Sequence, residues 1–190
     1  MLDFNEDISE ILLTADEIAA RVKELGRGLS EEFDGKFPLL IGVLKGSFIF
    51  MADLIRNIDV PCSADFMAVS SYGNSAHTTG AVQINKDVSE DVENRHIILI
   101  EDILDTGLTM NYLVNYFTNR NPASITLVTL LDKPVRRLVP IAADYVGFVI
   151  PNHFVVGYGL DYDEYYRNLP YIGVLKPETY SDAEGVSQFD

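Results

Sequence analysis

The sequence is poor in the residues that build disulfide frameworks and zinc sites. It has one cysteine, Cys62, and three histidines, at positions 77, 96 and 153. A single cysteine cannot form an intramolecular disulfide, and no cysteine and histidine cluster has the spacing of zinc ligands. A disulfide-stapled scaffold and a structural zinc site are therefore excluded, and we expect Cys62 to be a packing residue rather than a nucleophile.

Long apolar runs and positive charge are also scarce. No run approaches the roughly 20 apolar residues of a membrane span, and the acidic start MLDFNEDISE lacks the basic and apolar regions of a secretory signal. The 14 lysines and arginines are outnumbered by 29 aspartates and glutamates, which gives a formal net charge of -15. Such a surface repels nucleic acid and anionic membranes, so we expect a cytoplasmic protein with neither as a partner.

The length and composition of the chain fit one folded domain. Its 190 residues are 47% hydrophobic and 23% charged, close to the values of ordinary globular domains. Repeats, low-complexity tracts and linkers rich in Pro, Gly or Ser are absent. We therefore predict a single domain over residues 1–190, with a core at about 14–150 and a smaller lobe built mainly from residues 151–180.

Helical and strand patterns alternate along the core. A helix is predicted from Thr14 to Leu25, where Thr14 and Glu17 form a capping-box pair and Gly26 follows as a stop signal. The same reasoning predicts helices at 47–56 and 110–117 and short apolar strands at 39–44, 96–100 and 125–131. Strands that are apolar on both faces and alternate with helices indicate an α/β doubly wound fold with a mostly parallel sheet.

Two regions depart from this alternation. Residues 65–70 and 81–85 have strand character on either side of a polar stretch, which predicts a protruding hairpin with a flexible loop. The last quarter of the chain, rich in tyrosine and turn residues, predicts short strands of a smaller lobe. Residues 181–190 are expected to form a frayed tail.

The most informative stretch is residues 97–109, IILIEDILDTGLT. Ligands of parallel sheets bind beyond the carboxyl ends of the strands, so Glu101 and Asp102 are expected at the edge of a crevice. The following DTGLT loop leads into a helix whose free N–H groups suit a phosphate, and Gly107 permits close approach of the backbone. The two acids can accept hydrogen bonds from a sugar diol and support a hydrated Mg²⁺. The stretch predicts a sugar-phosphate site, although an acid pair taken alone is more typical of a solvated strand end.

This stretch resembles the phosphoribosyl pyrophosphate signature of the type I phosphoribosyltransferases, an apolar strand ending in two acids followed by Asp-Thr-Gly-x-Thr. The resemblance implies that family's fold, and it implies that Glu101 and Asp102 hold the ribose hydroxyls. It also assigns the 5'-phosphate to the loop residues Asp105, Thr106, Gly107, Leu108 and Thr109. Leu108 is a departure, because some relatives carry lysine there. Asp105 is implied to be the catalytic general base or acid for the purine proton.

Residues 43–50, VLKGSFIF, resemble the pyrophosphate loop of the hypoxanthine-guanine phosphoribosyltransferases, a branch of the same family. The resemblance implies that Lys45 and Gly46 bind the leaving group and that the peptide bond between Leu44 and Lys45 is cis. Read without the other motifs, the segment would be an ordinary turn from strand to helix.

Two further motifs of that branch follow along the chain. Ser71 and Tyr72 fit its Ser-Tyr loop, which closes over the reacting centre and excludes water. Lys133, in an Asp-Lys-Pro sequence after the strand at 125–131, resembles the lysine that donates to the 6-oxo group of the base. Because lysine has donors and no acceptor, it would oppose the 6-amino group of adenine.

Residues 150–169, IPNHFVVGYGLDYDEYYRNL, resemble the purine-binding hood of the branch along their whole length. The resemblance implies that Phe154 stacks on the purine and that Val155 reads the base edge through its main chain. It implies that Asp161, like the Glu101 and Asp102 pair, holds Mg²⁺. Arg167 is implied to bind pyrophosphate, a role that suits its planar guanidinium.

The resemblance extends from about residue 14 to about residue 175 and implies purine salvage. The reaction would transfer the 5-phosphoribosyl group from phosphoribosyl pyrophosphate to hypoxanthine, guanine or xanthine, with Mg²⁺, in a homodimer or homotetramer. One alternative is an RNA-binding regulator on the same fold, which the acid excess disfavours. Another is an aspartyl-phosphate receiver domain, disfavoured because the acid pair and Asp105 share one strand and loop.

Overall fold

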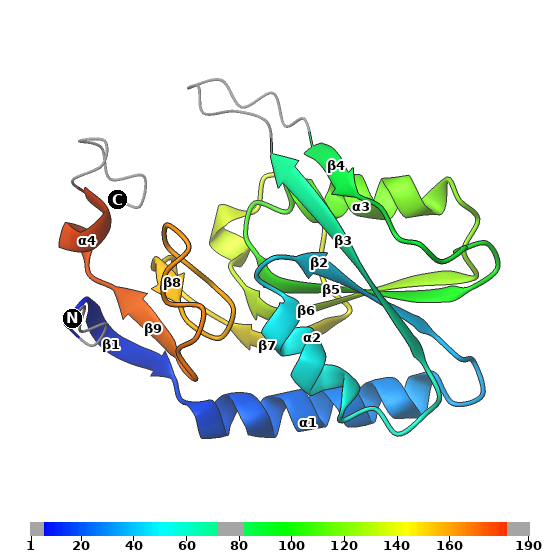
Figure 1. The fold of residues 1–190 in the computed structure, drawn as a ribbon, viewed down its shortest axis with the longest axis horizontal. Helices are drawn as coiled ribbons and strands as arrows, with labels where there is room; N and C mark the ends of the chain where they lie inside the picture. The colour runs from blue at the N-terminus through cyan, green and yellow to red at the C-terminus, as the bar shows by residue number, and fades with distance from the viewer. Residues whose placement is uncertain (1–5, 72–81, 182–190) are drawn as a thin grey trace.

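The computed structural model describes residues 6–71 and 82–181. Its strands are β1 (Ile8–Leu13), β2 (Leu39–Leu44), β3 (Ser63–Ser71), β4 (Val82–Lys86), β5 (His96–Leu104), β6 (Ser124–Asp132), β7 (Tyr145–Val149), β8 (Val155–Val156) and β9 (Ile172–Leu175). Its helices are α1 (Ala15–Glu32), α2 (Phe48–Ile55), α3 (Leu108–Thr118), the 3-10 helix η1 (Pro134–Arg136) and α4 (Pro177–Ser181). The described strands form a six-stranded main sheet in the order β4-β3-β2-β5-β6-β7 and a three-stranded sheet in the order β1-β9-β8 (Figure 1).

The main sheet is parallel except at β4, and helices cover both of its faces. Strand β5 pairs in parallel with β2 and β6, and β6 with β7. Successive side chains point to opposite faces, so Ile98 packs in the cluster under α1 and α2, whereas Ile97 packs in the cluster under α3 (Figure 1). The predicted doubly wound α/β architecture with a mostly parallel sheet is confirmed.

Helix α1 begins where the sequence predicted and ends later. Thr14 and Glu17 form the reciprocal capping box, with the Thr14 amide 2.9 Å from the Glu17 carboxylate. The prediction that Gly26 stops the helix was wrong, since α1 continues to Glu32. A β-carbon on Gly26 would lie 2.4 Å from the Asn57 carbonyl oxygen. Glycine is therefore required by the close approach of the chain after α2 and does not end the helix.

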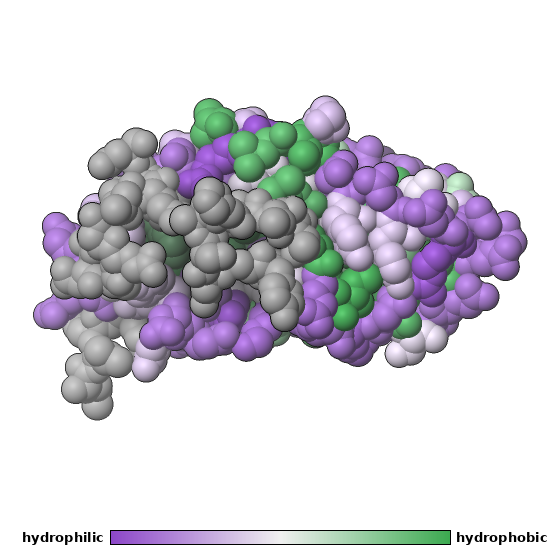
Figure 2. Space-filling model, turned by 90° about the horizontal axis from the view of Figure 1, so that it is seen from above, coloured by the Kyte–Doolittle hydropathy of each residue, from purple (hydrophilic) through white to green (hydrophobic). Residues whose placement is uncertain are grey.

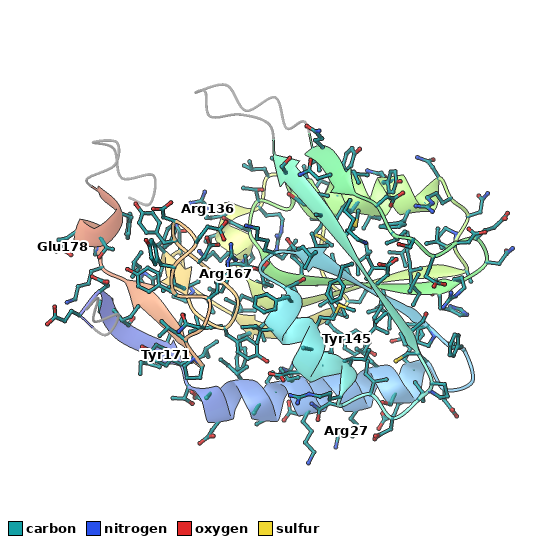
Figure 3. The ribbon with its side chains drawn as sticks, in the orientation of Figure 1. Arg27, Arg136, Tyr145, Arg167, Tyr171 and Glu178 are labelled. Atoms are coloured by element: carbon teal, nitrogen blue, oxygen red, sulfur yellow. The ribbon has the colours of Figure 1, made fainter. Side chains whose placement is uncertain are left out.

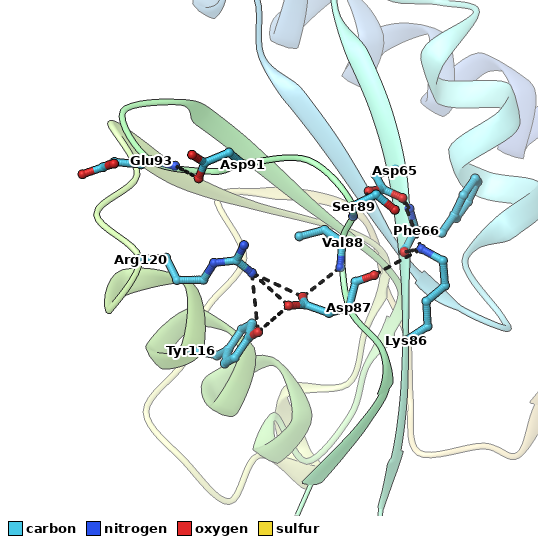
Figure 4. A network of polar contacts seen from close by, with 10 residues as sticks. All are labelled: Asp65, Phe66, Lys86, Asp87, Val88, Ser89, Asp91, Glu93, Tyr116 and Arg120. Carbon is cyan, nitrogen blue, oxygen red and sulfur yellow. Dashed lines mark hydrogen bonds and ion pairs between the residues drawn. The ribbon is translucent and has the colours of Figure 1, made fainter.

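The predicted hairpin is formed by β3 and β4, which pair antiparallel at the edge of the main sheet. Its tip, residues 72–81, lies outside the described residues. A carboxylate network holds its base: Asp65 accepts from the amides of Phe66 at 2.7 Å and Ser89 at 2.5 Å and pairs with Lys86 (Figure 4). A second carboxylate of the same base, Asp87, accepts from Tyr116 Oη on α3 at 2.6 Å. These contacts fix the strands that carry the loop.

The smaller lobe contains an element that the sequence prediction did not assign to it. Strand β1, from the N-terminal end of the chain, pairs antiparallel with β9, which in turn pairs with β8. The lobe, called the hood below, therefore comprises β1 together with residues 151–181. Because α1 follows β1 after a single cap residue, the helix connects the hood to the underside of the main sheet (Figure 1).

The described part of the face seen in Figure 2 is largely hydrophilic, with apolar side chains gathered in a limited area. The most exposed large apolar side chains include Val135, Leu138 and Val149, with 74%, 69% and 68% of their surface exposed. In residues 6–71 and 82–181, no helix is both long and apolar enough to cross a membrane.

Candidate active site

The acid pair lies inside strand β5 rather than after it. Backbone pairing with β6 continues through Glu101, opposite Thr129, to Leu104, opposite Asp132. The expected strand end at residue 100 was therefore too early, and Glu101 and Asp102 belong to the last part of the strand. The loop that begins with Asp105 leaves the sheet directly after these two acids.

Burial and mutual repulsion keep the two carboxyl groups from ionising easily. Burial, and then the neighbouring Asp102 charge, raise the pKa of Glu101 well above its ordinary value. Burial raises the pKa of Asp102 to about 6, although the Ile103 amide, which donates to Asp102 Oδ1 at 2.9 Å, and the Arg167 charge oppose this rise. Glu101 Oε2 is buried and has no hydrogen-bond partner among the described residues. The pair is therefore an acceptor site for hydroxyl donors or a cation.

A small pocket of about 70 Å³ opens beside these acids at the start of α3. The residues that line it are Glu101, Ile103, Leu104, Asp105, Thr106, Gly107, Thr109 and Met110. Gly107 is the N-cap of α3 in the left-handed conformation, with φ of 81°. A β-carbon there would lie 2.6 Å from Ile141 Cγ2, so the turn needs glycine on two counts. Leu108 begins the helix, and its N–H donates to Thr106 Oγ1 at 3.4 Å. The first turn of an α-helix leaves N–H groups without intrahelical partners, and such groups suit an anion.

Two arginines that the sequence analysis did not single out hold the loop. Arg136 Nε lies 3.0 Å from Asp105 Oδ1, which pairs the predicted catalytic acid with a cation. Arg137 donates to the carbonyl oxygens of Leu104 at 3.0 Å and Asp105 at 2.7 Å, and it also pairs with Asp132. The Arg-Arg pair after the Asp-Lys-Pro motif was the available signal, but nothing in the sequence brought it to the phosphate loop.

Lys133 is buried, with 4% of its surface exposed, and its Nζ donates to the His153 carbonyl oxygen at 2.5 Å. Burial lowers the pKa of the lysine, whereas the nearby Asp105 charge raises it. The lysine therefore lies between the phosphate loop and the hood, and it has two donors beyond the one it gives to His153. A snorkelling surface lysine is inconsistent with this burial.

The predicted pyrophosphate loop follows β2 and contacts the acid pair. The peptide bond between Leu44 and Lys45 is cis, as expected. A β-carbon on Gly46 would lie 1.5 Å from Asp102 Oδ2, so the carboxylate occupies the space that any side chain would need. Lys45 Nζ lies 2.8 Å from Glu164 Oε1, and both side chains are exposed.

Arg167 of the hood lies in a group of oxygens. Its Nη1 donates to the Gly159 carbonyl oxygen at 2.8 Å, and its Nη2 lies 2.8 Å from Asp161 Oδ1 and 3.3 Å from Glu164 Oε2. Its Nε is buried without a hydrogen-bond partner among the described residues. Figure 3 shows Arg136 and Arg167 in the region between the hood and the main sheet. The predicted Asp161 and Arg167 thus form one ion pair.

The predicted base-binding residues Phe154 and Val155 lie in the hood. The ring of Phe154 stacks on Tyr180 of α4, with centroids 5.0 Å apart and planes 23° apart, and meets Tyr162 edge-on at 5.6 Å. Val155 is buried in β8 opposite Val174. At the other side of the site, the backbone of Ser71 pairs with Val82, and Tyr72 lies outside the described residues.

Comparison with known proteins shows which family this chain resembles. A family model described as the phosphoribosyl transferase domain matches residues 9–163. The chain is 58% identical over 174 residues to the hypoxanthine-guanine phosphoribosyltransferase of Bacillus subtilis, covering 92% of this chain and 97% of that protein. It is 55% identical over 178 residues to a bifunctional protein TilS/HprT of Listeria innocua, covering 94% of this chain but 28% of that longer protein. A crystal structure of a Staphylococcus aureus hypoxanthine phosphoribosyltransferase superposes with a TM-score of 0.91 and 52% identity, covering 94% of this chain and 97% of that one.

The chain therefore belongs to the phosphoribosyltransferase family, in its hypoxanthine-guanine branch. The main sheet with its hood is the type I phosphoribosyltransferase fold, and both the predicted family and the predicted fold class are confirmed. Membership of this family excludes the receiver-domain alternative.

Proposed function

We propose that the chain transfers a 5-phosphoribosyl group from phosphoribosyl pyrophosphate to a 6-oxopurine, giving the purine nucleotide and pyrophosphate. The observation that carries this proposal is the half-buried acid pair of β5 beside a pocket of about 70 Å³ at the N-terminus of α3. The acids suit the ribose diol, and the free N–H groups of the helix suit the 5'-phosphate.

In the proposed reaction a purine ring nitrogen forms a bond to ribose C1', and the bond from C1' to the pyrophosphate oxygen breaks. The electron pair leaves with pyrophosphate, and the purine proton passes to Asp105. This carboxylate lies beside the pocket and pairs with Arg136, which orients it. Lys45, the loop at Gly46 and Arg167 would bind the negative charge that develops on the leaving group.

The base would lie between the hood and Lys133. A lysine donor facing the 6-position favours hypoxanthine, guanine and xanthine over adenine. The contact from Lys133 to the His153 carbonyl fixes the lysine against the segment that carries Phe154 and Val155. An aromatic face at Phe154 suits stacking on a flat base.

Magnesium is the proposed cofactor, and the chemistry of the donors fits it. Buried Glu101 Oε2 without a partner is an oxygen ligand of the kind that a hard cation prefers. Among the described residues, no group of three or more His, Cys, Asp or Glu side chains could hold a metal ion without other ligands. Mg²⁺ would therefore be held by Glu101 and Asp102, and a second ion by Asp161, together with substrate oxygens and water. When bound, the metal would neutralise charge on the pyrophosphate.

The test is release of pyrophosphate by the purified chain with phosphoribosyl pyrophosphate, Mg²⁺ and each of hypoxanthine, guanine, xanthine and adenine. We expect turnover with one or more of the 6-oxopurines and a far lower rate with adenine. No release with any 6-oxopurine would reject the proposal. Chelation of Mg²⁺ should abolish turnover, and its re-addition should restore it.

Two further expectations concern the protein as a whole. We propose a homodimer or homotetramer, which sedimentation of the purified chain tests directly, with a monomer as the contradicting result. We also propose a cytoplasmic location, without nucleic-acid or membrane partners, in line with the net charge of -15.

A further inference from the structure

Two loops from opposite parts of the molecule meet at the proposed pyrophosphate site. One is the turn between β2 and α2 that holds Gly46, and the other is the hood loop at Gly157–Leu160, which follows β8. A β-carbon on Gly159 would lie 2.1 Å from the Gly46 carbonyl oxygen, so the two backbones are in direct contact. The mutual position of the two loops thus sets the geometry of the leaving-group site.

The main-chain hydrogen bonds of the hood loop do not connect it to α2. Gly157, Tyr158 and Gly159 all have positive φ, at 100°, 49° and 103°. Their main-chain hydrogen bonds go to other hood residues: Tyr158 N donates to Leu169 O at 2.9 Å, and Gly159 N to Arg167 O at 3.0 Å. These bonds shape the loop but do not attach it to the main domain.

Tyr158 and Leu160 pack in the core cluster that includes Met51 of α2, and the Tyr158 hydroxyl adds a directional bond to that helix. The Tyr158 ring is buried, with 7% of the residue exposed, and its hydroxyl donates to Asp53 Oδ2 on α2 at 2.6 Å. Burial and the Asp53 carboxylate raise the pKa of the tyrosine, so the hydroxyl stays protonated as a donor. A tyrosine at positive φ is unusual, because a side chain there is strained and glycine is the ordinary choice.

Asp53 and the Gly46 turn belong to one rigid unit. Helix α2 begins two residues after Gly46, and its first turn is fixed by Met51 N donating to Ser47 O at 2.8 Å. Ser47, fully buried, also donates through its hydroxyl to the Val43 carbonyl oxygen at 2.6 Å. A hydrogen bond to Asp53 therefore ties the hood to the same unit that presents Gly46.

We propose that the Tyr158–Asp53 hydrogen bond positions the hood loop against the Gly46 turn and thereby sets the affinity for pyrophosphate and phosphoribosyl pyrophosphate. This inference rests on the proposed function. Arg167, whose Nη1 donates to the Gly159 carbonyl oxygen at 2.8 Å, follows the loop that Tyr158 anchors. Tyr158 and Asp53 are positioning residues, because the Tyr158 hydroxyl binds Asp53 Oδ2 and the other oxygen of Asp53 pairs with Arg56.

The test compares full-length Tyr158→Phe with Tyr145→Phe. Tyr145 Oη also donates to a carboxylate, Glu32 Oε2, at 2.6 Å, but Tyr145 lies at the amino end of β7, away from the carboxyl ends that form the site. Both variants lose one tyrosine hydroxyl and one hydrogen bond to a carboxylate. Calorimetry with Mg²⁺ and pyrophosphate, together with KM values for each substrate, separates a positioning effect from a general loss of stability.

For Tyr158→Phe we expect pyrophosphate to bind about tenfold more weakly, a change of about 1.4 kcal/mol. The KM for phosphoribosyl pyrophosphate should rise by a similar factor, whereas the KM for the purine stays within about twofold. For Tyr145→Phe we expect both pyrophosphate affinity and the two KM values to match those of the wild type.

Variants of Asp53 test the same hydrogen bond from the acceptor side. Asp53→Asn keeps an oxygen acceptor and should retain wild-type pyrophosphate affinity, whereas Asp53→Ala should lose as much affinity as Tyr158→Phe. The double variant that combines Tyr158→Phe with Asp53→Ala should lose no more pyrophosphate affinity than either single variant. The reason is that each of the three proteins lacks the same hydrogen bond.

Equal pyrophosphate affinity in Tyr158→Phe and Tyr145→Phe would overturn the inference and leave the proposed function intact. Additive losses in the double variant would also overturn it. A wild-type protein that neither binds pyrophosphate nor transfers the phosphoribosyl group would overturn both.

Discussion

Replacing Asp102 by asparagine should stabilise the ligand-free protein at neutral pH while it damages the proposed site. Burial raises the pKa of this carboxyl from 3.8 to about 6, with the charge of Asp161 contributing to the rise. A carboxyl with a raised pKa favours the folded state when protonated. Its ionisation at neutral pH therefore destabilises the fold, and the neutral amide of asparagine avoids this penalty.

The raised pKa of Asp102 sets both the size and the pH dependence of the gain in free energy of unfolding. A difference of about two pKa units corresponds to about 3 kcal/mol at pH 7.5, where the wild-type Asp102 is ionised. As the pH falls below about 6, the folded carboxyl becomes protonated, and near pH 4.5 the difference shrinks to about 1 kcal/mol. Below the unfolded pKa of 3.8 it should vanish.

The assay is urea unfolding of wild type and Asp102→Asn between pH 4.5 and 7.5, without Mg²⁺ or substrate. Asp34→Asn is the matched control, since Asp34 is exposed after α1 and the same substitution there removes a carboxylate from the surface. For Asp102→Asn we expect the gain in free energy of unfolding to rise with pH up to about 6 and then to level off at about 3 kcal/mol. A variant less stable than the wild type at pH 7.5, or a difference independent of pH, would refute the reasoning.

Three substitutions test the other parts of the site. Asp105→Asn should lose most of its turnover while still binding nucleotide, measured by rate and by nucleotide titration, and equal activity would reject the general-base role. Gly46→Ala should lower kcat/KM for phosphoribosyl pyrophosphate by at least tenfold, because its β-carbon would overlap the Asp102 carboxylate, which lies 1.5 Å away; wild-type kinetics would contradict this crowding. Lys133→Ala should lose turnover with 6-oxopurines, and unchanged kinetics with hypoxanthine and guanine would remove the base-recognition assignment.

The parts of the fold that the sequence predicted are those set by local patterns. Continuous apolar runs flanked by turn residues identified β2, β5 and β6, and the capping box at Thr14 located the start of α1. The end of α1 was wrong, because Gly26 carries a stop signal in the sequence but serves close packing against Asn57 in the structure. Strand β1 was missed in the hood because its partner β9 lies more than 150 residues later along the chain.

In the candidate site, too, the features that local sequence motifs determine could be predicted, whereas those that depend on tertiary contacts could not. Residues inside contiguous motifs, such as Glu101 and Gly107, could be identified because the motif itself carries the geometry of strand, turn and helix. Arg136 and the Tyr158–Asp53 bond could not, because each depends on a contact between segments that only tertiary packing brings together. Likewise, nothing in the sequence indicates that Asp102 occupies the space beside Gly46.

The environment of Cys62 supports the prediction that this residue serves packing. Cys62 is partly buried, and burial raises the pKa of its thiol. A raised pKa lowers the thiolate fraction at neutral pH and thus the reactivity of the sulfur. Packing, not nucleophilic chemistry, is the role that this environment suits.

The most direct test of the central claim is a crystal structure of the protein with a purine nucleotide and Mg²⁺. We predict that the 5'-phosphate lies in the pocket between Asp105 and Thr109, with the ribose hydroxyls bonded to Glu101 and Asp102. A phosphate bound anywhere else on the protein, with this pocket left free, would contradict the account.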